Sequence, residues 1–464
     1  MNQEPLFRVD EEAIQRALEA GSRTDSARVR DVLQKSAEAQ GLTPAEVAVL
    51  SGISDPALLG ELFATAREVK ERIYGRRLVI FAPLYISNLC SNECLYCAFR
   101  ARNKELQRKV LTQELIAQEV KTLIEQGHKR LLLVAGESYP QEGFPYILRS
   151  IDTVYGVKSG QGEIRRVNVN IAPLRVEEFR ELKDRKIGTF QLFQETYHRE
   201  TYARVHLAGQ KKDFDWRVSA MDRAMQARID DVGIGVLFGL CDWRFEILAL
   251  LQHIQHLESR FGVGPHTISV PRIEPASGSD LASQPPKPVS DVDFRKIVAI
   301  LRLAVPYTGI IMSTREAVNI RRETFALGVS QISAGSRSSP GGYAEEVNEK
   351  ASQFSLGDHR SLDEVVRDVA SLGYIPSFCT ACYRLGRTGR DFMDLAKPGE
   401  IKSHCDPNAL STFKEYLTDY ASAGTRQVGE ALIEKVLGEK GEAERAAAEK
   451  MLAAVGRGER DVFV

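Results

Sequence analysis

The chain has 464 residues and nearly balanced charge, with 62 Lys and Arg against 63 Asp and Glu. This length exceeds one ordinary core but suits an α/β barrel of roughly 250–300 residues with an addition at each end. The balanced charge argues against nucleic-acid binding, which needs a basic surplus. The first residues lack the features of a signal peptide, and no apolar run could span a bilayer. We therefore expect a soluble, cytoplasmic protein with no membrane partner.

Residues 1–75 are predicted to form a helical N-terminal extension. Thr43-Pro44 and Asp55-Pro56 each combine a capping residue with a proline in the first turn, which is a typical start of a helix. Gly75 is expected to end the helix that begins after Asp55.

From residue 76 to 375, short apolar segments alternate with amphipathic ones. Amphipathic helices are predicted at 112–126, 214–229, 245–261, 291–303 and 362–372. Eight βα units predict a closed (β/α)8 barrel, and their even spacing favours it over the alternative, an open doubly wound sheet. The predicted strands are 78–86, 130–135, 166–171, 189–194, 232–240, 267–272, 309–313 and 329–334.

Residues 376–464 break this alternation and are predicted to form a separate C-terminal domain. It contains three cysteines and a charged helical end at 429–455. The part of that end rich in Ala, Glu and Lys, 442–453, is most simply a solvated helix.

Six of the seven cysteines fall into two groups of three, which indicates metal or redox chemistry in a reducing compartment. Cys90, Cys94 and Cys97 follow the first predicted strand with the spacing C-x3-C-x2-C. Three thiolates can hold three irons of a 4Fe–4S cluster and leave the fourth iron open to a small molecule. A structural zinc site is the alternative, but it needs a fourth ligand, and the nearest candidate, His128, lies in another unit.

This segment resembles the signature of the radical S-adenosylmethionine (SAM) superfamily, with Tyr96 at its aromatic position. The resemblance implies that SAM binds the open iron. It also implies that Gly136 and Glu137, after the second strand, contact the SAM amino group, and that Glu195 and Tyr197, after the fourth strand, lie near its ribose. All of these positions are at the carboxyl ends of strands, where such barrels have their active sites. A salt bridge at the rim is the alternative for Glu195.

The second group, Cys379, Cys382 and Cys405, has the spacing C-x2-C-x22-C. It suits a second cluster with an open iron, or a zinc site with His404 as fourth ligand. Each barrel helix returns the chain to the bottom of the barrel, so this group should lie there, roughly 20–25 Å from the first. His266, which begins the sixth strand, should face it and is a candidate ligand for an extra iron.

The two cysteine groups and the segments 194–197, 264–272 and 313–316 together resemble the tyrosine-cleaving radical SAM lyases that mature FeFe hydrogenase. The resemblance covers nearly the whole chain, and the spacing in the tail is its most specific element. It implies three cofactors: a SAM-binding 4Fe–4S cluster, SAM, and an auxiliary 4Fe–4S cluster with an extra, labile iron.

The resemblance also implies an activity and partners. L-Tyrosine would be cleaved to p-cresol and dehydroglycine, and dehydroglycine would be converted at the auxiliary cluster to CO and cyanide for the hydrogenase active site. The implied partners are an electron donor such as a ferredoxin or flavodoxin and other hydrogenase maturases.

The seventh strand offers a site for the tyrosine carboxylate. Arg315 supplies a forked cation, and Ser313 and Thr314 supply hydroxyl donors. Arg272, after the sixth strand, is a candidate for SAM or tyrosine binding, with a structural ion pair as the alternative.

Three other functions stay open at this point. A 2-iminoacetate synthase of thiamine biosynthesis would share the barrel and carry a zinc-stabilised tail. A non-catalytic iron–sulfur scaffold for hydrogenase assembly would hold the clusters without cleaving SAM. A radical methylthiotransferase also has two clusters, but the near-neutral charge disfavours an RNA substrate.

Overall fold

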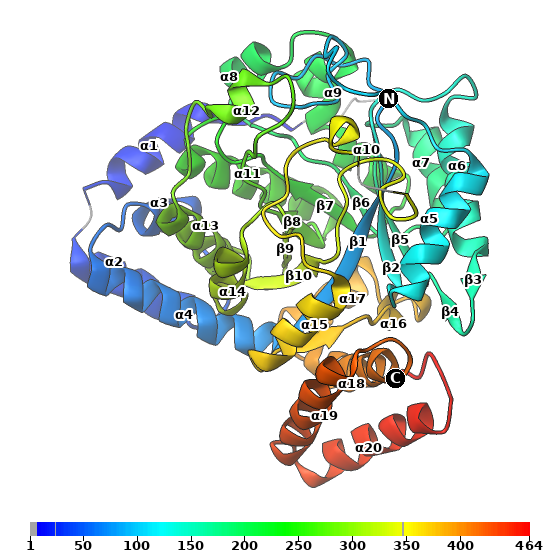
Figure 1. Cartoon of the computed structure of the whole chain (residues 1–464). Coiled ribbons are helices and arrows are strands. Elements are labelled where there is room, and N and C mark those ends of the chain that lie inside the picture. Colours follow the sequence, from blue (N-terminus) through cyan, green and yellow to red (C-terminus); the bar gives the residue numbers. More distant parts are fainter. Residues whose placement is uncertain (1–6, 24, 346–347) are drawn as a thin grey trace.

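A closed barrel of eight parallel strands forms the centre of the protein (Figure 1). The computed structural model describes residues 7–23, 25–345 and 348–464, so the first six residues of the predicted extension lie outside the described residues. The barrel closes where β10 pairs with β1. The predicted (β/α)8 fold is therefore confirmed. Its strands are β1 (Arg77–Ser87), β2 (Arg130–Ala135), β5 (Arg166–Asn170), β6 (Phe190–Gln191), β7 (Val232–Gly235), β8 (Thr267–Ser269), β9 (Gly309–Met312) and β10 (Val329–Ser333).

Three strands are shorter than the sequence predicts. Regular pairing ends early in β6, β7 and β8, and only single bridges such as Glu195 to Val236 and Phe238 to Arg272 continue beyond them. Glu195 has a φ of 71°, which no regular strand accommodates. The upper ends of these strands therefore open into irregular loops.

Helices cover the outside of the barrel. The predicted helix 214–229 is divided at Ser219, whose hydroxyl donates to the Asp215 carbonyl. A two-strand ribbon, β3 (Lys158–Ser159) and β4 (Gly162–Glu163), follows α6. The covering elements are α5 (Gln113–Glu125), α6 (Phe144–Gly156), α7 (Val176–Asp184), α8 (Arg199–Val205), η1 (Gln210–Lys212), α9 (Phe214–Val218), α10 (Ala220–Gln226), α11 (Trp243–Phe261), α12 (Asp280–Ser283), α13 (Asp291–Ala304), α14 (Val318–Leu327), η2 (Glu349–Ala351) and α15 (Leu362–Ser371).

The N-terminal helices begin and end at the residues that the sequence indicates. Thr43 forms a capping box with Glu46, and the Asp55 carboxylate accepts from two backbone N–H groups of the first turn of α4. Gly75, with a φ of 59°, ends α4, which packs on α13 and α14. The four helices are α1 (Glu11–Gly21), α2 (Ser26–Ser36), α3 (Pro44–Ser51) and α4 (Pro56–Tyr74).

The C-terminal tail lies below the barrel, at the end where the strands begin (Figure 1). Its first strand, β11 (Ile375–Ser377), pairs with the first residues of β1. Glu415 of α18 forms buried ion pairs with Arg165 and Lys129 of the barrel, at 2.7 and 3.3 Å. No helix in the described ranges is long and apolar enough to cross a membrane. The tail helices are α16 (Ala381–Arg384), α17 (Gly389–Ala396), α18 (Lys402–Asp419), α19 (Ala423–Gly438) and α20 (Glu442–Gly456).

Candidate active site and second cysteine cavity

The first cysteine group lies in a cavity of about 180 Å³ at the carboxyl ends of the barrel strands. Cys90, Cys94 and Cys97 all line this upper cavity. Gly136, at the end of β2, lets their loop lie directly against the strand, because a Cβ there would collide with the Leu89 carbonyl. The three thiols therefore face one space, held by the packing of their loop on β2.

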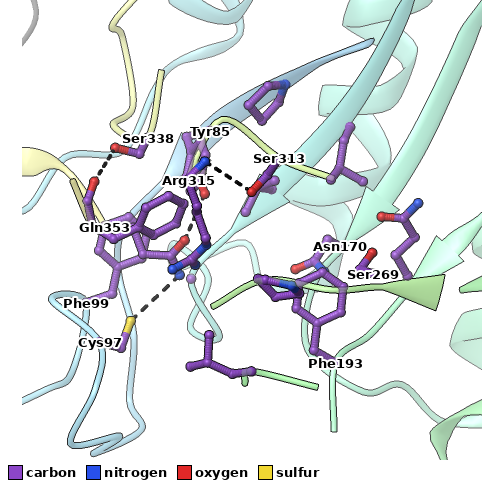
Figure 2. A pocket seen from close by; sticks show the side chains of 18 of the residues that line it. Tyr85, Cys97, Phe99, Asn170, Phe193, Ser269, Ser313, Arg315, Ser338 and Gln353 are labelled. Carbon is purple, nitrogen blue, oxygen red and sulfur yellow. Dashed lines mark hydrogen bonds between the residues drawn. The ribbon is translucent and has the colours of Figure 1, made fainter. Parts of the chain in front are cut away.

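Burial sets the chemistry of these thiols. It raises the pKa of Cys90 to about 11, and it also raises the pKa of Cys94 and Cys97. The side-chain amide of Gln353 lies 3.7 Å from the Cys97 sulfur (Figure 2). A metal that binds here must displace the thiol protons, as iron does when it binds cysteine.

Two carboxylates and two cations form a buried network beside the cysteines. Glu137 accepts from Asn92 and from Arg217, both at 2.8 Å. Glu195 accepts from Lys211 at 2.7 Å, and Arg217 lies 3.6 Å from it. The rim salt bridge considered for Glu195 is therefore present, yet Glu137 and Glu195 both line the cavity as well. Their remaining oxygen lone pairs are available to a ligand.

Tyr96 and Tyr197, which are both predicted to lie near SAM, occupy different positions relative to the upper cavity. Tyr96 lines the cavity, and its hydroxyl lies 2.8 Å from Nε2 of His206. Tyr197, by contrast, is fully buried away from the cavity, with its hydroxyl 2.7 Å from Nδ1 of His253. The prediction that Tyr197 lies near the SAM ribose is not supported by this position.

Arg272 also lies away from the upper cavity. Its guanidinium binds the carboxylates of Glu316 and Asp291 and lies over the ring of Phe294. These contacts match the structural ion pair that was the alternative for Arg272, and Arg272 is not among the described residues that line the upper cavity.

Ser313 and Arg315 line the upper cavity (Figure 2), and Thr314 lines it beside them. The Arg315 guanidinium lies over the ring of Phe354 and has no hydrogen bond or ion pair among the described residues. Burial lowers the pKa of Arg315, which shows that neighbouring charges do not fully compensate this cation. An unpaired arginine in a cavity is suited to a carboxylate ligand.

Sequence reasoning missed charged residues of this cavity. Lys211 and Arg217 follow the short strand β6, in η1 and α9, Glu274 follows β8, and Arg337 follows β10. Burial and the nearby Glu316 raise the pKa of Glu274 to about 7. All four lie outside regular strands, so no periodic pattern marked them.

The second cysteine group lies in a cavity of about 50 Å³ at the amino ends of the strands. Cys379, Cys382 and Cys405 line this lower cavity together with His266, as predicted. His404 does not line it, so the zinc alternative loses its proposed fourth ligand. In the described ranges no three Cys, His, Asp or Glu side chains are gathered closely enough to hold a single metal ion. A cluster, whose irons are several, does not require its cysteines to meet at one point.

The surroundings of the lower cavity are basic. Arg77 and Arg130 are buried in its wall, and Arg130 donates to the Cys379 carbonyl at 3.0 Å. No Asp or Glu is among its described lining residues. Burial lowers the pKa of His266, which favours the neutral imidazole, and Nε2 lies 3.1 Å from the Tyr383 hydroxyl. Neutral imidazole and thiolates amid arginines suit an anionic iron–sulfur centre.

Known proteins resemble this chain over the segments that form both cysteine cavities. Residues 84–251 match the radical SAM superfamily, and residues 269–375 match the Biotin and Thiamin Synthesis associated domain. A crystal structure of HydG, a maturase of the [FeFe]-hydrogenase, is 48% identical and superposes with a TM-score of 0.95, covering 98% of this chain and 99% of that one. The chain belongs to the HydG family of radical SAM enzymes. HydG from Carboxydothermus hydrogenoformans is 42% identical, with a TM-score of 0.84, over 95% of this chain and 98% of that one.

The HydG family accounts for more of the chain than its other relatives do. The 2-iminoacetate synthase of Escherichia coli K12 is 32% identical over 362 residues, which are 92% of that protein but 77% of this chain. The two HydG structures cover nearly all of it. This difference in coverage favours HydG over the synthase as a guide to function.

Proposed function

We propose that this enzyme cleaves L-tyrosine to p-cresol and dehydroglycine and converts dehydroglycine to CO and cyanide for assembly of the FeFe-hydrogenase active site. The observation that carries the proposal is the position of two cysteine groups at opposite mouths of one closed barrel. Its likeness to HydG over nearly its whole length supports the same function. The proposed partners are a ferredoxin or flavodoxin as electron donor and other hydrogenase maturases as acceptors of the product.

In the upper cavity, Cys90, Cys94 and Cys97 would hold the SAM-binding 4Fe–4S cluster. This cluster, when bound, supplies the electron that cleaves SAM to a carbon radical. The carboxylates of Glu137 and Glu195 would receive the amino group and the ribose hydroxyls of SAM. Lys211 and Arg217 fix both carboxylates through ion pairs, so their orientation is set before SAM binds.

The same cavity can orient tyrosine. Arg315 would bind the carboxylate, with Ser313 and Thr314 beside it. The aromatic side chains of Phe99 and Phe193 line the wall and give the ring of the substrate an apolar surface (Figure 2). Exclusion of water by this wall would keep the radical from side reactions.

In the lower cavity, Cys379, Cys382 and Cys405 would hold the auxiliary cluster and His266 would bind its extra iron. Dehydroglycine, HN=CH–CO2⁻, contains exactly the atoms of cyanide, CO and water, so its conversion needs no oxidant or reductant. Arg77 and Arg130 would attract its carboxylate to this end of the barrel.

Anaerobic reconstitution with iron, sulfide, SAM, reductant and tyrosine tests the proposal. We expect 5′-deoxyadenosine, p-cresol, CO and cyanide as products. Formation of p-cresol without CO, with only four irons per chain, would instead indicate a 2-iminoacetate synthase. An absence of SAM cleavage in the reduced, iron-loaded protein would indicate a scaffold.

Replacement of Arg315 by Ala should raise the KM for tyrosine about ten- to a hundredfold. The change removes charge-assisted hydrogen bonds worth roughly 1.5–3 kcal/mol. Steady-state p-cresol assays measure this KM, and equilibrium binding of SAM should change little. Arg322→Ala is the matched control, because Arg322 pairs with Asp368 on the surface and lines neither cavity. An unchanged KM in Arg315→Ala would show that the carboxylate binds elsewhere.

Replacement of His266 by Ala should leave a four-iron auxiliary cluster and lower the occupancy of the extra iron. The variant loses one neutral nitrogen ligand and no cysteine. Iron analysis and electron paramagnetic resonance of the reconstituted protein measure both quantities. His256→Ala, which removes a partner of Asp222 and lines neither cysteine cavity, should keep the wild-type iron content. Full occupancy in the His266 variant would assign the extra iron to another ligand.

A further inference from the structure

A third cavity, of about 800 Å³, lies between the amino end of the barrel and the tail. It is built by the start of β5, the turn after α7, the turn after α10 and the short helix α16. Tyr383 lines both this cavity and the lower cysteine cavity. One aromatic side chain is thus shared by the walls of the two spaces.

The lining of the third cavity carries a surplus of positive charge. Lys183, Lys186 and Arg228 make no side-chain hydrogen bond or ion pair within the described ranges. Other cations of the lining are already paired: Arg165 and Arg384 with Glu415 and Asp461, which lie outside the lining, and Arg185 with Asp152. Seven Lys and Arg face four Asp around it: Arg165, Arg166, Lys183, Arg185, Lys186, Arg228 and Arg384 against Asp152, Asp184, Asp230 and Asp231.

Arg166 is the buried member of this set, with 5% of its surface exposed. Its Nε has no hydrogen-bond partner, and Nη1 reaches the Ile187 carbonyl only at 3.5 Å. Nη2 lies 4.0 Å from Asp231, at the outer limit of an ion pair. Burial lowers the pKa of Arg166 to about 10, as expected for a cation whose lost hydration is poorly replaced.

A glycine in the wall of the cavity leaves room for the Arg166 guanidinium. Gly188 lines the cavity, and a Cβ there would collide with Nε of Arg166. The absence of a side chain at this position lets the guanidinium lie over the strand and face the open space. Five N–H donors in one plane, with few protein acceptors, match the oxygens of a carboxylate or phosphate.

We propose that the third cavity is a binding site for a small oxyanion, a carboxylate or a phosphate, held by Arg166 at its base and by Lys183, Lys186 and Arg228 at its rim. The Arg166 guanidinium stacks on the ring of Tyr383, whose hydroxyl contacts His266. Tyr383 therefore lies between the proposed anion site and the cavity of the second cysteine group. This inference does not depend on which reaction the enzyme catalyses.

Among the described residues, Asp231 is the carboxylate that competes with an external anion for Arg166. Its Oδ1 already accepts from the Gly389 N–H at 3.0 Å, and its Oδ2 has no hydrogen-bond partner. A strong internal pair would bring Oδ2 closer than 4.0 Å and satisfy both groups. Asp231 Oδ1 lies 3.7 Å from Nδ1 of His266 as well, whereas Asp231 Oδ2 and Arg166 Nε have no hydrogen-bond partner. The free Nε of Arg166 favours an external anion.

Calorimetric titration of the full-length, reconstituted enzyme with inorganic phosphate and, separately, with malonate tests the proposal. Chloride buffer keeps the ionic strength constant. We expect one site for at least one of the two anions, and the comparison tells phosphate from carboxylate. Arg166→Gln should weaken that binding about ten- to a hundredfold, because it removes charge-assisted hydrogen bonds. Arg322→Gln, a surface control, should bind as the wild type does.

Two further variants keep the test decisive. If Arg166→Gln does not fold, Gly188→Ala displaces the guanidinium while its charge remains, and it should also weaken binding. Asp231→Asn should strengthen binding by removing the competing carboxylate. Wild-type affinity in the Arg166 and Gly188 variants, equal weakening in Arg322→Gln, or no binding up to about 10 mM anion would each overturn the proposal. None of these results bears on p-cresol formation, so this site and the proposed function fail or succeed separately.

Discussion

Replacement of Cys94 by Ala should abolish 5′-deoxyadenosine, p-cresol and CO together. Cys94 is 4% exposed and lines the upper cavity between the other two cysteines of its group. Two remaining thiolates cannot hold the cluster, and without it no electron reaches SAM. Chromatography of the products and iron analysis of the reconstituted variant measure the effect.

Cys241 provides a matched control. It belongs to neither group of three cysteines, it is partly buried, and it lines neither cysteine cavity. Cys241→Ala should therefore retain all products and the full iron content. p-Cresol formation by Cys94→Ala, in protein shown to be folded, would mean that tyrosine cleavage does not need the first cysteine group.

The sequence predicted the barrel and the two-mouth arrangement because both follow from regular patterns. Capping residues such as Thr43 and Asp55 act within one turn, so their effect is local and visible in the sequence. The position of Cys379 at the bottom follows from the count of βα units, since each unit returns the chain to the amino end of the strands. The actual bounds of β6, β7 and β8 were harder to predict, because their upper ends leave regular pairing.

The direction of individual side chains was the part that the sequence could not supply. Pro271 and Ile273 line the upper cavity, whereas Arg272 between them points to Glu316. Neighbouring side chains at the end of a strand point to opposite sides, so an irregular end decides which of them faces the ligand. Arg217 was missed for another reason: its partner Glu137 is 80 residues away in the sequence.

Replacement of both Cys379 and Cys382 by Ala should separate the two proposed reactions. Tyrosine cleavage needs only the upper cavity, so p-cresol formation should stay within roughly tenfold of the wild type, about 1.4 kcal/mol of barrier. CO should fall to background, because the iron that would bind and trap it is absent. Some cyanide can persist if dehydroglycine decomposes in solution. Gas chromatography or haemoglobin trapping for CO, with p-cresol from the same reaction, gives the ratio.

The outcome also distinguishes a catalytic tail from a structural one, because the tail has contacts that do not involve these cysteines. Arg165 and Lys129 of the barrel bind Glu415 of the tail at 2.7 and 3.3 Å, and β11 pairs with β1, so the tail should stay on the barrel in the variant. A tail that depended on zinc would unfold instead, and both products would be lost together. CO at the wild-type ratio to p-cresol would contradict both readings, since the second reaction would then have to occur in the upper cavity.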